Sequence, residues 1–582
     1  MNFLRSIAKY MSPYKKRYFF GILALIVVDV ATLLSPQILR NLANDFEMGT
    51  LTNNNLIKYA LFVIMIGAFV GMGRFFWRIY IFGSGRTIEY DLRKEVFNHW
   101  LTLDQNFFIN NKTGDLMSYA TNDINQIIRF TGDGIMTSVD STFMLFFTVF
   151  MMIKTTGFKF TLLSLAPLPL IVLLTIFFGR IFHRLFQREA DSWANLTDVV
   201  QESFSGIGVV KAFLLEDHVC EKFREANQNF YNTKVKTIKS TSFFFPLMMF
   251  ISGICYLIIT YFGAQWVINS KLQLGDFIAH YTYLGLITWP VRGLGITINI
   301  IQRGAASLER VKEILKVKSQ IKILDDPIHL GGNKIDVTFK NVSFRYPKSK
   351  INAVSNIDFS IPNGKTVALI GKTGSGKSTI AKLLFRQYDV TEGQILINNN
   401  SIKTIDLKDF SSKTGYVPQD NFLFSDSIKE NIAFSFDEYP GDEHVIDASK
   451  KSGVFDDINS FKYAFDTEIG ERGVTLSGGQ KQRISISRAI IKKPSLLILD
   501  DSLSAVDTET EKKILDELKL LESSVLIIAH RISTIKHADE ILFLEDGKIV
   551  ERGTHDELVK LNGKYNQMYE HQKLESEITK EV

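Results

Sequence analysis

The stretch Leu369-Ile370-Gly371-Lys372-Thr373-Gly374-Ser375-Gly376-Lys377-Ser378-Thr379 decides the fold of the chain around it. An apolar run at 366–370 predicts a buried parallel strand, and residues 380–385 begin a helical pattern directly after the loop. The spacing G-x-x-x-x-G-K-S is typical of a loop whose backbone N–H groups surround phosphate at the positive end of a helix. We expect Lys377 to reach the β- and γ-phosphates and Ser378 to bind Mg²⁺. An ordinary glycine-rich turn is the alternative, and the flanking strand and helix disfavour it.

The region around this loop predicts an α/β domain. From about residue 337 onward, short β-rich runs alternate with helical patterns, which favours a largely parallel sheet. One apolar run, 496–499, ends in Asp500, a carboxylate placed to hold Mg²⁺ beside phosphates. Another, 525–529, is followed by His530. A third motif opens a helix with a hydroxyl and glycines, which suits it for anions. It consists of Leu476, Ser477, Gly478, Gly479 and Gln480.

Composition places part of the chain in lipid. A chain of 582 residues is too long for one compact domain. Hydrophobic residues make up 46% of it, including 46 Phe, which is too apolar for a soluble nucleotide enzyme of this size. The net charge of +5 carries no argument for nucleic acid, and we expect no nucleic-acid partner. Cys220 and Cys255 form no disulfide framework, and residues 1–16 lack a signal-peptide cleavage site.

Six apolar spans, each of about 20 residues, precede the α/β region. They are residues 18–39, 57–82, 135–153, 160–181, 243–268 and 277–301. The connections 83–134 and 182–242 are rich in Lys and Arg, as is the stretch before the first span. The positive-inside rule therefore predicts that both termini and the nucleotide site are cytosolic, with the spans in the bacterial plasma membrane. Helical patterns at 86–103 and 182–204 predict that spanning helices continue into the cytosol, with breaks at 110–115 and 205–208.

The order of the motifs resembles the ATP-binding cassette of ABC transporters. That order is the phosphate loop, Gln419 in Y-V-P-Q-D, residues 476–480, 496–500 and 504–507, and His530. With six spans in front, the chain resembles a half-size ABC exporter of the multidrug and lipid type. Residues 202–213 (E-S-F-S-G-I-G-V-V-K-A-F) and 467–473 (T-E-I-G-E-R-G) share the resemblance.

The resemblance implies a domain plan. Residues 1–316 would be a transmembrane domain with six helices, 317–336 a linker, 337–570 the ATP-binding cassette, and 571–582 a charged, frayed tail. The fold class is thus a membrane all-α domain followed by an α/β P-loop ATPase domain. The tips at 110–115 and 205–214 would be coupling helices, and the second would dock on the partner subunit's ATPase domain.

Residue roles are also implied by the resemblance. Tyr346 would stack on adenine, and the loop from Gly371 to Thr379 would bind the phosphates of ATP. Ser378, Gln419 and Asp500 would position Mg²⁺, with Gln419 also sensing the γ-phosphate. Ser477, Gly478, Gly479 and Gln480 would complete a nucleotide site on the other subunit, and Asp507 would cross the dimer interface. His530 would contact the γ-phosphate and the attacking water. Taken singly, each residue also has an ordinary reading as a surface aromatic or a loop polar group.

One position departs from the family pattern. Competent transporters have glutamate after the Mg²⁺ aspartate, whereas this chain has Asp501. A carboxylate that is one methylene shorter lies about 1 Å from where a base is needed, and such a displacement can lower the rate ~100-fold. A water or a small backbone shift could compensate. We expect a weak catalytic site in this chain and a heterodimer with a second half-transporter.

The expected function is therefore ATP-dependent export of small apolar or amphipathic molecules, such as drugs or lipids, coupled to ATP hydrolysis. A regulatory or channel-like protein gated by ATP is the alternative, as is an importer of the same architecture. Asp29 and Asp140 fall within or near spans, where ionisable groups are costly and often functional. Pairing with a neighbouring helix is an equally good reading of both, and the cargo itself is not encoded in any motif.

Overall fold

The structure is a computed structural model that describes residues 2–470 and 476–581. It divides into two units. One comprises Met1–Leu101 and Thr113–Val317, and the other comprises Thr102–Lys112 and Lys318–Val582. We call them the membrane unit and the ATPase unit and describe each by itself.

Among the described residues, six helical stretches are long and apolar enough to cross a membrane, which confirms the six predicted spans. They are Ser6–Glu47, Asn53–Leu101, Thr113–Thr156, Phe158–Ser205, Glu216–Ile268 and Leu274–Lys316. Several contain more than one element. The elements are α1 (Asn2–Met11), η1 (Ser12–Tyr14), α2 (Lys15–Thr32), α3 (Leu34–Glu47), α4 (Asn53–Leu101), α6 (Thr113–Ser118), η2 (Tyr119–Asp123), α7 (Ile124–Arg129), η3 (Phe130–Gly134), α8 (Ile135–Thr156), α9 (Phe158–Leu165), α10 (Leu168–Ser205), α11 (Ile207–Ala212), α12 (Glu216–Ile268) and α13 (Leu274–Lys316).

Two of these helices show how far the spans extend. Helix α4 has 49 residues and α12 has 53, so they are about 75 and 80 Å long at 1.5 Å per residue. The hydrocarbon core of a bilayer is about 30 Å thick. Each helix therefore runs well beyond a membrane without interruption, as the helical patterns in the connections predicted. The predicted breaks are also present, after Asn110 and after Ser205.

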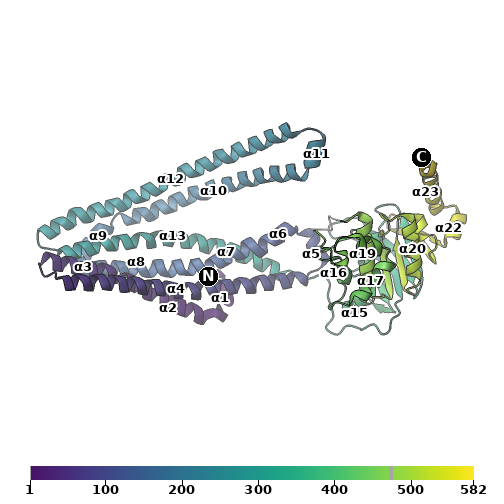
Figure 1. Cartoon of the computed structure of the whole chain (residues 1–582), viewed down its shortest axis with the longest axis horizontal. Helices are drawn as coiled ribbons and strands as arrows, with labels where there is room; N and C mark the ends of the chain where they lie inside the picture. Colours follow the sequence, from purple (N-terminus) through teal and green to yellow (C-terminus); the bar gives the residue numbers. More distant parts are fainter. Residues whose placement is uncertain (1, 471–475, 582) are drawn as a thin grey trace. The chain divides into compact units, whose positions relative to one another are not determined.

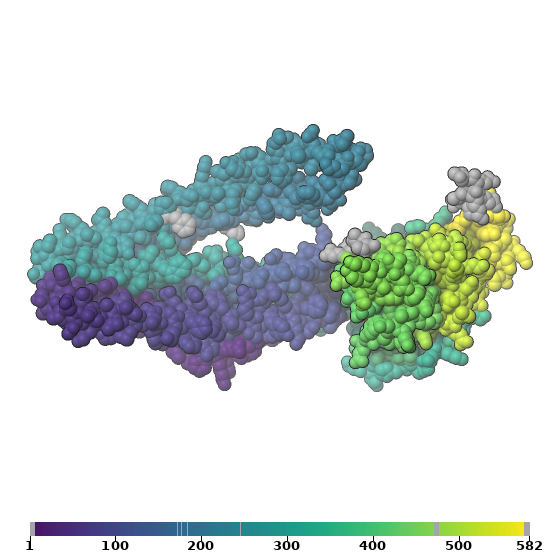
Figure 2. Space-filling view, viewed as in Figure 1, coloured from purple at the N-terminus to yellow at the C-terminus, as the bar shows by residue number. Residues whose placement is uncertain are grey.

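The membrane unit contains a helix pair that packs against α13 at one end and diverges from the other helices at the other end (Figure 1). Helices α10 and α12 pack along each other and are joined by the short helix α11. Figure 1 shows this pair diverging from the bundle formed by α4, α8 and α13 toward α11. In the space-filling view, open space separates the pair from the α4 and α8 side of the same unit (Figure 2). The end that carries α11 is thus left uncovered within the membrane unit.

The ATPase unit contains two sheets. A four-stranded antiparallel sheet has the order β2-β1-β4-β5, and a six-stranded sheet has the order β10-β9-β3-β8-β7-β6. In the larger sheet, pairing is parallel from β9 through β3, β8 and β7 to β6, which confirms the predicted α/β class. The strands are β1 (Val337–Phe344), β2 (Val354–Ile361), β3 (Thr366–Gly371), β4 (Glu392–Ile397), β5 (Asn400–Ser401), β6 (Thr414–Val417), β7 (Leu496–Asp500), β8 (Ser524–Ile528), β9 (Glu540–Glu545) and β10 (Lys548–Gly553).

The larger sheet is buried on both faces. Along β3, Val367 and Leu369 join a core with the smaller sheet, α14 (Lys377–Leu384) and Phe410, whereas Ala368 and Ile370 join a core with most of the other helices. A strand buried on both faces reads as a continuous apolar run, which is the pattern at 366–370. The helices that complete the unit are α15 (Leu407–Ser412), α16 (Ile428–Ala433), α17 (Asp442–Lys451), α18 (Phe455–Ser460), η4 (Ala464–Asp466), α19 (Gly478–Ile490), α20 (Thr508–Lys519), α21 (Ile532–Ile535), α22 (His555–Leu561) and α23 (Lys564–Glu581).

The C-terminal segment is helical. The fraying of residues 571–582 stays a prediction, and helix α23 continues to Glu581. The physical reason lies in its sequence, which contains many Lys, Glu and Gln and no Gly or Pro after residue 564. Such residues lose little side-chain freedom in a helix, and nothing in the segment interrupts the pattern.

Helix α5 (Gln105–Asn110) belongs to the ATPase unit although it lies early in the chain. The Asn110 side-chain oxygen accepts a hydrogen bond from Lys348 Nζ at 2.5 Å. Asp104, which caps the helix at Phe107 N–H, also accepts the backbone N–H of Gln320 at 2.5 Å. The tip of the first long connection is therefore held by residues that follow the last span.

Candidate nucleotide site

Parallel strands bring the predicted site residues to one edge of the sheet. Strands β3, β8, β7 and β6 are successive neighbours, and Leu369 and Asp500 both pair with Ile528. The carboxyl ends of parallel strands lie at the same edge. The phosphate loop after β3, His530 after β8 and Asp500 at the end of β7 therefore converge, as the order of motifs predicted. Gln419 follows β6 at the same edge.

Two glycines of the phosphate loop occupy positions that are unfavourable for a residue with a side chain. Gly374 and Gly376 have φ of 84° and 102°, values that side-chain-bearing residues rarely adopt. A Cβ at Gly376 would lie 2.5 Å from the carbonyl oxygen of Ala353. Ser375 is buried, and its hydroxyl oxygen makes no hydrogen bond. The loop thus has the close backbone approach and the free polar group that a phosphate ligand requires.

Lys377, Ser378 and Asp500 form the centre of the site. Lys377 Nζ donates to the carbonyl oxygens of Gly371 at 2.8 Å and Lys372 at 3.0 Å. Ser378 Oγ donates to Asp500 Oδ1 at 3.0 Å. The Lys377 ammonium therefore lies against the backbone of the phosphate loop. The Ser378 hydroxyl and the Asp500 carboxylate lie side by side, as a pair of oxygen ligands suited to Mg²⁺.

Burial shifts the pKa values of four titratable groups in the site. It lowers the pKa of Lys377 and raises the pKa of Asp500, with the charge of Asp501 adding to the latter shift. Burial also raises the pKa of Asp501 and lowers the pKa of His530, which the charge of Lys377 lowers further. Burial disfavours the charged form of each group. A bound phosphate would favour the charged form of Lys377, and a bound metal ion would favour the charged form of Asp500.

Asp501 has an unusual backbone. Its φ is +49°, in the left-handed region, and its N–H donates to the carbonyl oxygen of Ile528 at 2.8 Å. Its carbonyl oxygen accepts from the Ser504 hydroxyl at 3.0 Å. A short polar side chain such as aspartate tolerates this conformation better than most residues. The backbone at Asp501 is thus fixed from both sides.

Tyr346 lies beside the phosphate loop. Its hydroxyl and the Thr379 hydroxyl are 3.1 Å apart and share a hydrogen bond. Its ring packs edge-on against Phe344 and Tyr388, with centroid distances of 4.9 and 5.3 Å. The half-buried ring is therefore held in a fixed orientation next to the helix that follows the loop.

Helix α19 begins in a capping box. The Ser477 hydroxyl accepts from the Gln480 N–H at 3.3 Å, and the Gln480 side-chain oxygen accepts from the Ser477 N–H at 3.0 Å. The Gln480 amide also donates to Asp457 at 2.9 Å, and Asp457 forms an ion pair with Arg483 at 2.8 Å. These bonds fix the helix N-terminus that the sequence predicted to be suited to anions.

Gln482 is a residue that the sequence motifs did not indicate. It is buried; its amide donates to Ser504 Oγ at 3.3 Å, and its oxygen accepts from Ala505 N–H at 3.0 Å. Gly479 allows the same close approach, since a Cβ there would lie 2.8 Å from the Ala505 carbonyl oxygen. Helix α19 and the loop after Asp501 are therefore joined directly. The pairing links residues 22 or more apart in sequence, so no local pattern predicts it.

Replacement of Gln482 by alanine should lower the ATPase activity of the assembled protein about tenfold, because the loop after Asp501 loses both bonds and shifts. Gln482→Glu keeps the acceptor for Ala505 N–H and should lose less activity. Steady-state hydrolysis, measured together with thermal unfolding, checks this. Wild-type rates from both variants would show that the two bonds do not position the loop.

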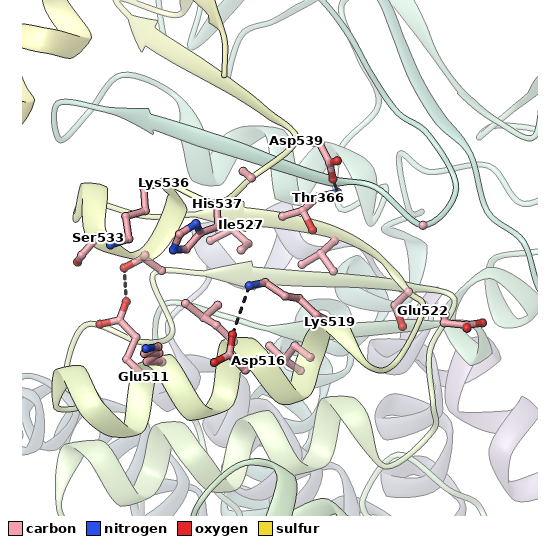
Figure 3. A pocket seen from close by; sticks show the side chains of 18 of the residues that line it. Thr366, Glu511, Asp516, Lys519, Glu522, Ile527, Ser533, Lys536, His537 and Asp539 are labelled. Atoms are coloured by element: carbon pink, nitrogen blue, oxygen red, sulfur yellow. Dashed lines mark hydrogen bonds and ion pairs between the residues drawn. The ribbon is translucent and has the colours of Figure 1, made fainter. Parts of the chain in front are cut away.

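A separate cavity of about 410 Å³ lies between α20, β8 and the segment after His530. Figure 3 shows Glu511, Asp516 and Lys519 on α20, with Lys536 and His537 on the facing side. The Thr534 hydroxyl donates to Glu511 Oε1. None of the predicted nucleotide residues lines this cavity. The Thr534–Glu511 hydrogen bond joins α20, which follows Asp507, to α21, which follows His530.

For two predicted residues, the described part of the chain shows no hydrogen bond to the phosphate loop. Gln419 is exposed, and its only described hydrogen bond is from Asn421 to its carbonyl oxygen. Asp507 caps α20 by accepting the Thr510 N–H at 2.9 Å, and this backbone bond lowers the pKa of its carboxyl group. Of the predicted segment 467–473, residues 471–473 lie outside the described residues.

The chain matches known families over most of its length. Residues 18–291 match the family described as ABC transporter transmembrane region, and residues 354–504 match the family described as ABC transporter. It is 37% identical to the probable multidrug resistance ABC transporter ATP-binding/permease protein YheI of Bacillus subtilis, with 98% of each chain covered. It is 32% identical to the multidrug resistance-like ATP-binding protein MdlA of Escherichia coli, over 99% of this chain and 98% of that one.

A solved structure agrees in fold. A bacterial Atm1-family ABC exporter with ATP bound superposes with a TM-score of 0.81 and 26% identity, covering 96% of this chain and 99% of that chain. The converging site residues, six spans and these similarities lead to one conclusion. The chain belongs to the ABC transporter family as a half-size exporter, an integral membrane protein that works as a dimer and whose ATPase domain couples ATP hydrolysis to export.

Proposed function

We propose that this chain is the subunit of a heterodimeric exporter that holds ATP at a slow site and lends Ser477, Gly478 and Gly479 to a fast site on its partner. The observation that carries the proposal is Asp501, where competent family members have glutamate. A homodimer would place the short carboxylate of Asp501 in both nucleotide sites. Both sites would then contain a well-formed α19 N-terminus and neither would contain a glutamate base. The fixed backbone at Asp501 supports the proposal, because it opposes the shift that could compensate for the missing methylene.

The phosphate loop would bind the nucleotide. Its backbone N–H groups and Lys377 would hold the phosphates of ATP, with Tyr346 against adenine. Ser378 and Asp500 would bind Mg²⁺, joined by Gln419 when its side chain turns inward. The 3.0 Å hydrogen bond between Ser378 and Asp500 supports this assignment of the metal ligands. His530, beside Lys377 and Asp501, would contact the γ-phosphate and water; when bound, Mg²⁺ supplies charge stabilisation at the phosphates.

The partner's docking site would be the uncovered end of the α10 and α12 pair. Apolar side chains gather there, and Phe204, Phe213 and Leu214 are 71%, 71% and 82% exposed. Such a patch is typical of an interaction surface. This supports docking of α11 on the partner subunit's ATPase domain. We place the spans in the bacterial plasma membrane with both termini and the ATPase domain cytosolic, from the basic residues of the long connections.

We expect Tyr346→Ala to weaken ATP binding by roughly 1 to 3 kcal/mol, as removal of a stacking aromatic does for nucleobases. Tyr346→Phe should stay close to wild type, because it keeps the ring and loses only the bond to Thr379. Titration of a fluorescent ATP analogue measures both. Equal losses from the two variants would mean that the hydroxyl, not the ring face, matters, and the adenine assignment would be wrong.

The whole proposal is tested by reconstitution. This chain and a candidate second half-transporter are placed in vesicles, separately and together, and ATP-dependent accumulation of an amphipathic dye is followed. The proposal expects accumulation from the mixture and little from this chain alone. Full activity of this chain alone would establish a homodimer and overturn the proposed division of sites.

A further inference from the structure

A side chain of the C-terminal helix holds the backbone around His530. The Gln572 amide donates to the His530 carbonyl oxygen at 2.7 Å, and the Gln572 side-chain oxygen accepts from the Ile532 N–H at 2.9 Å. Gln572 falls within residues 571–582, which the sequence predicted to be a tail outside the cassette. One residue of that segment therefore bridges the backbone on both sides of Arg531.

The direction of the His530 ring depends on this backbone. None of the hydrogen bonds in the described part of the chain involves the ring nitrogens. Burial lowers the pKa of the imidazole, the charge of Lys377 lowers it further, and the charge of Asp501 raises it. The ring thus lies beside two groups of the nucleotide site, and no hydrogen bond of its own fixes it there.

The segment that carries the histidine runs between a strand and a short helix. Its last described bond to the sheet goes from the Ala529 N–H to the Leu369 carbonyl oxygen, at 3.2 Å. Helix α21 then begins at Ile532, and the residue before it, Arg531, makes no side-chain capping bond. The first N–H groups of a helix have no partner within that helix. Gln572 accepts one of these N–H groups and so takes the place of the missing cap.

Helix α23 gives Gln572 a fixed base. One face of the helix, with the spacing i, i+3, i+4 and i+7, consists of Tyr565, Met568, Tyr569 and Gln572. Tyr565 is fully buried, and Met568 and Tyr569 pack against the same core. The Tyr565 N–H also donates to the Glu551 carboxylate at 3.0 Å. Because the first three residues of the face are anchored, the fourth is held against the histidine segment.

We propose that Gln572 is a positioning residue for His530, and that its two backbone bonds direct the imidazole toward the γ-phosphate and so favour ATP over ADP at this chain's own site. The inference rests on the role proposed for His530 and goes beyond it, because it names the group that holds the histidine in place. ADP lacks the γ-phosphate, so a misplaced ring should weaken the binding of ATP alone. A contribution of Gln572 to the packing of α23 is the competing explanation.

The experiment uses the assembled exporter in membrane vesicles and two probes, azido-ATP and azido-ADP. The readout is the concentration of each probe that gives half-maximal photolabelling of this subunit on ice, where hydrolysis is slow. Gln572→Met keeps the length of the side chain and removes both hydrogen bonds. We expect it to raise the value for azido-ATP at least about fivefold. The value for azido-ADP should not change.

Two further variants keep the result interpretable. Gln567→Met is the matched control, because Gln567 is exposed on the same helix and its side chain makes none of the described hydrogen bonds. It should leave both values at wild type. Gln572→Glu keeps the acceptor for the Ile532 N–H and replaces the donor to His530 by a carboxylate. It should show the same loss, specific to azido-ATP, if Gln572→Met does not fold.

A combination with His530→Ala shows whether Gln572 acts through the histidine. His530→Ala alone should raise the value for azido-ATP, because the proposed contact with the γ-phosphate is removed. Effects of two residues that act through one contact do not add. Gln572→Met should therefore raise this value no further when it is added to His530→Ala.

Equal losses for azido-ATP and azido-ADP would overturn the inference, because packing and not the histidine would then explain the two bonds. Wild-type values from a folded Gln572 variant would also overturn it, as would a further loss on the His530→Ala background. In these cases His530→Ala alone still binds azido-ATP less well, so the proposed function stands. A wild-type response of His530→Ala to azido-ATP would instead count against the proposed role of the histidine, and the inference would fail with it.

Discussion

Replacement of Lys377 by alanine should remove most nucleotide binding at this chain's own site. Its ammonium is the cation expected at the β- and γ-phosphates, and in this structure it is buried against the carbonyl oxygens of Gly371 and Lys372. Charge-assisted bonds to phosphate are about twice as strong as neutral ones. The loop amides alone should therefore hold ATP poorly. We expect photolabelling by an azido-ATP to fall at least about tenfold in the variant subunit.

Lys408→Ala is the matched control. Lys408 is exposed on α15 of the same unit, so this substitution changes the net charge equally while the loop stays intact. Its labelling should equal that of the wild type. Undiminished labelling of the Lys377 variant would show that the loop amides and Ser378 suffice, and the role assigned to Lys377 would be wrong.

The second large effect concerns the difference in ATP hydrolysis between the proposed fast and slow nucleotide sites. Ser477→Ala should abolish most ATP hydrolysis by the heterodimer, at least about tenfold, because it disables the N-terminus that completes the fast site. Asp501→Asn should change the rate within about twofold, because its site contributes little. Asp501→Glu could raise turnover at the slow site, where His530 lies beside it.

Loss of the Ser477 cap also destabilises α19 by about 0.5 to 2 kcal/mol, so the comparison needs a matched variant. Thr554→Ala removes the same kind of capping box, formed with Glu557 at the start of α22. It should lower thermal stability similarly and leave hydrolysis intact. Steady-state rates for the chain alone and with its partner decide the matter. A collapse on Asp501→Asn equal to that of Ser477→Ala would rule out one slow and one fast site.

The sequence predicted the features that depend on local patterns. Buried parallel strands are continuous apolar runs, and their ends mark the edge of the sheet, so Gly371, Asp500 and His530 could be placed together. The N-terminus of α19 was visible as the hydroxyl residue Ser477 followed by Gly478 and Gly479. The six spans followed from length and hydropathy alone.

Contacts between distant parts of the chain could not be predicted in this way. The bonds of Gln482 to Ser504 and Ala505, and of Gln480 to Asp457, join residues whose spacing carries no period. Asp29 and Asp140 were both visible, but nothing in their sequence surroundings shows that the two residues line one cavity. Such pairings depend on how helices pack, which one-dimensional periodicity does not encode.

The position of α5 in the ATPase unit has a consequence for synthesis of the chain. Asn110 and Lys348, which bond to each other, are 238 residues apart. A ribosome adds about 5 to 20 residues per second, so α5 emerges roughly 10 to 50 s before Lys348, which holds it. Helices α8, α10, α12 and α13 enter the membrane during that interval. The ATPase fold is therefore completed around a segment made long before the rest, and a fragment that begins after the last span would lack it.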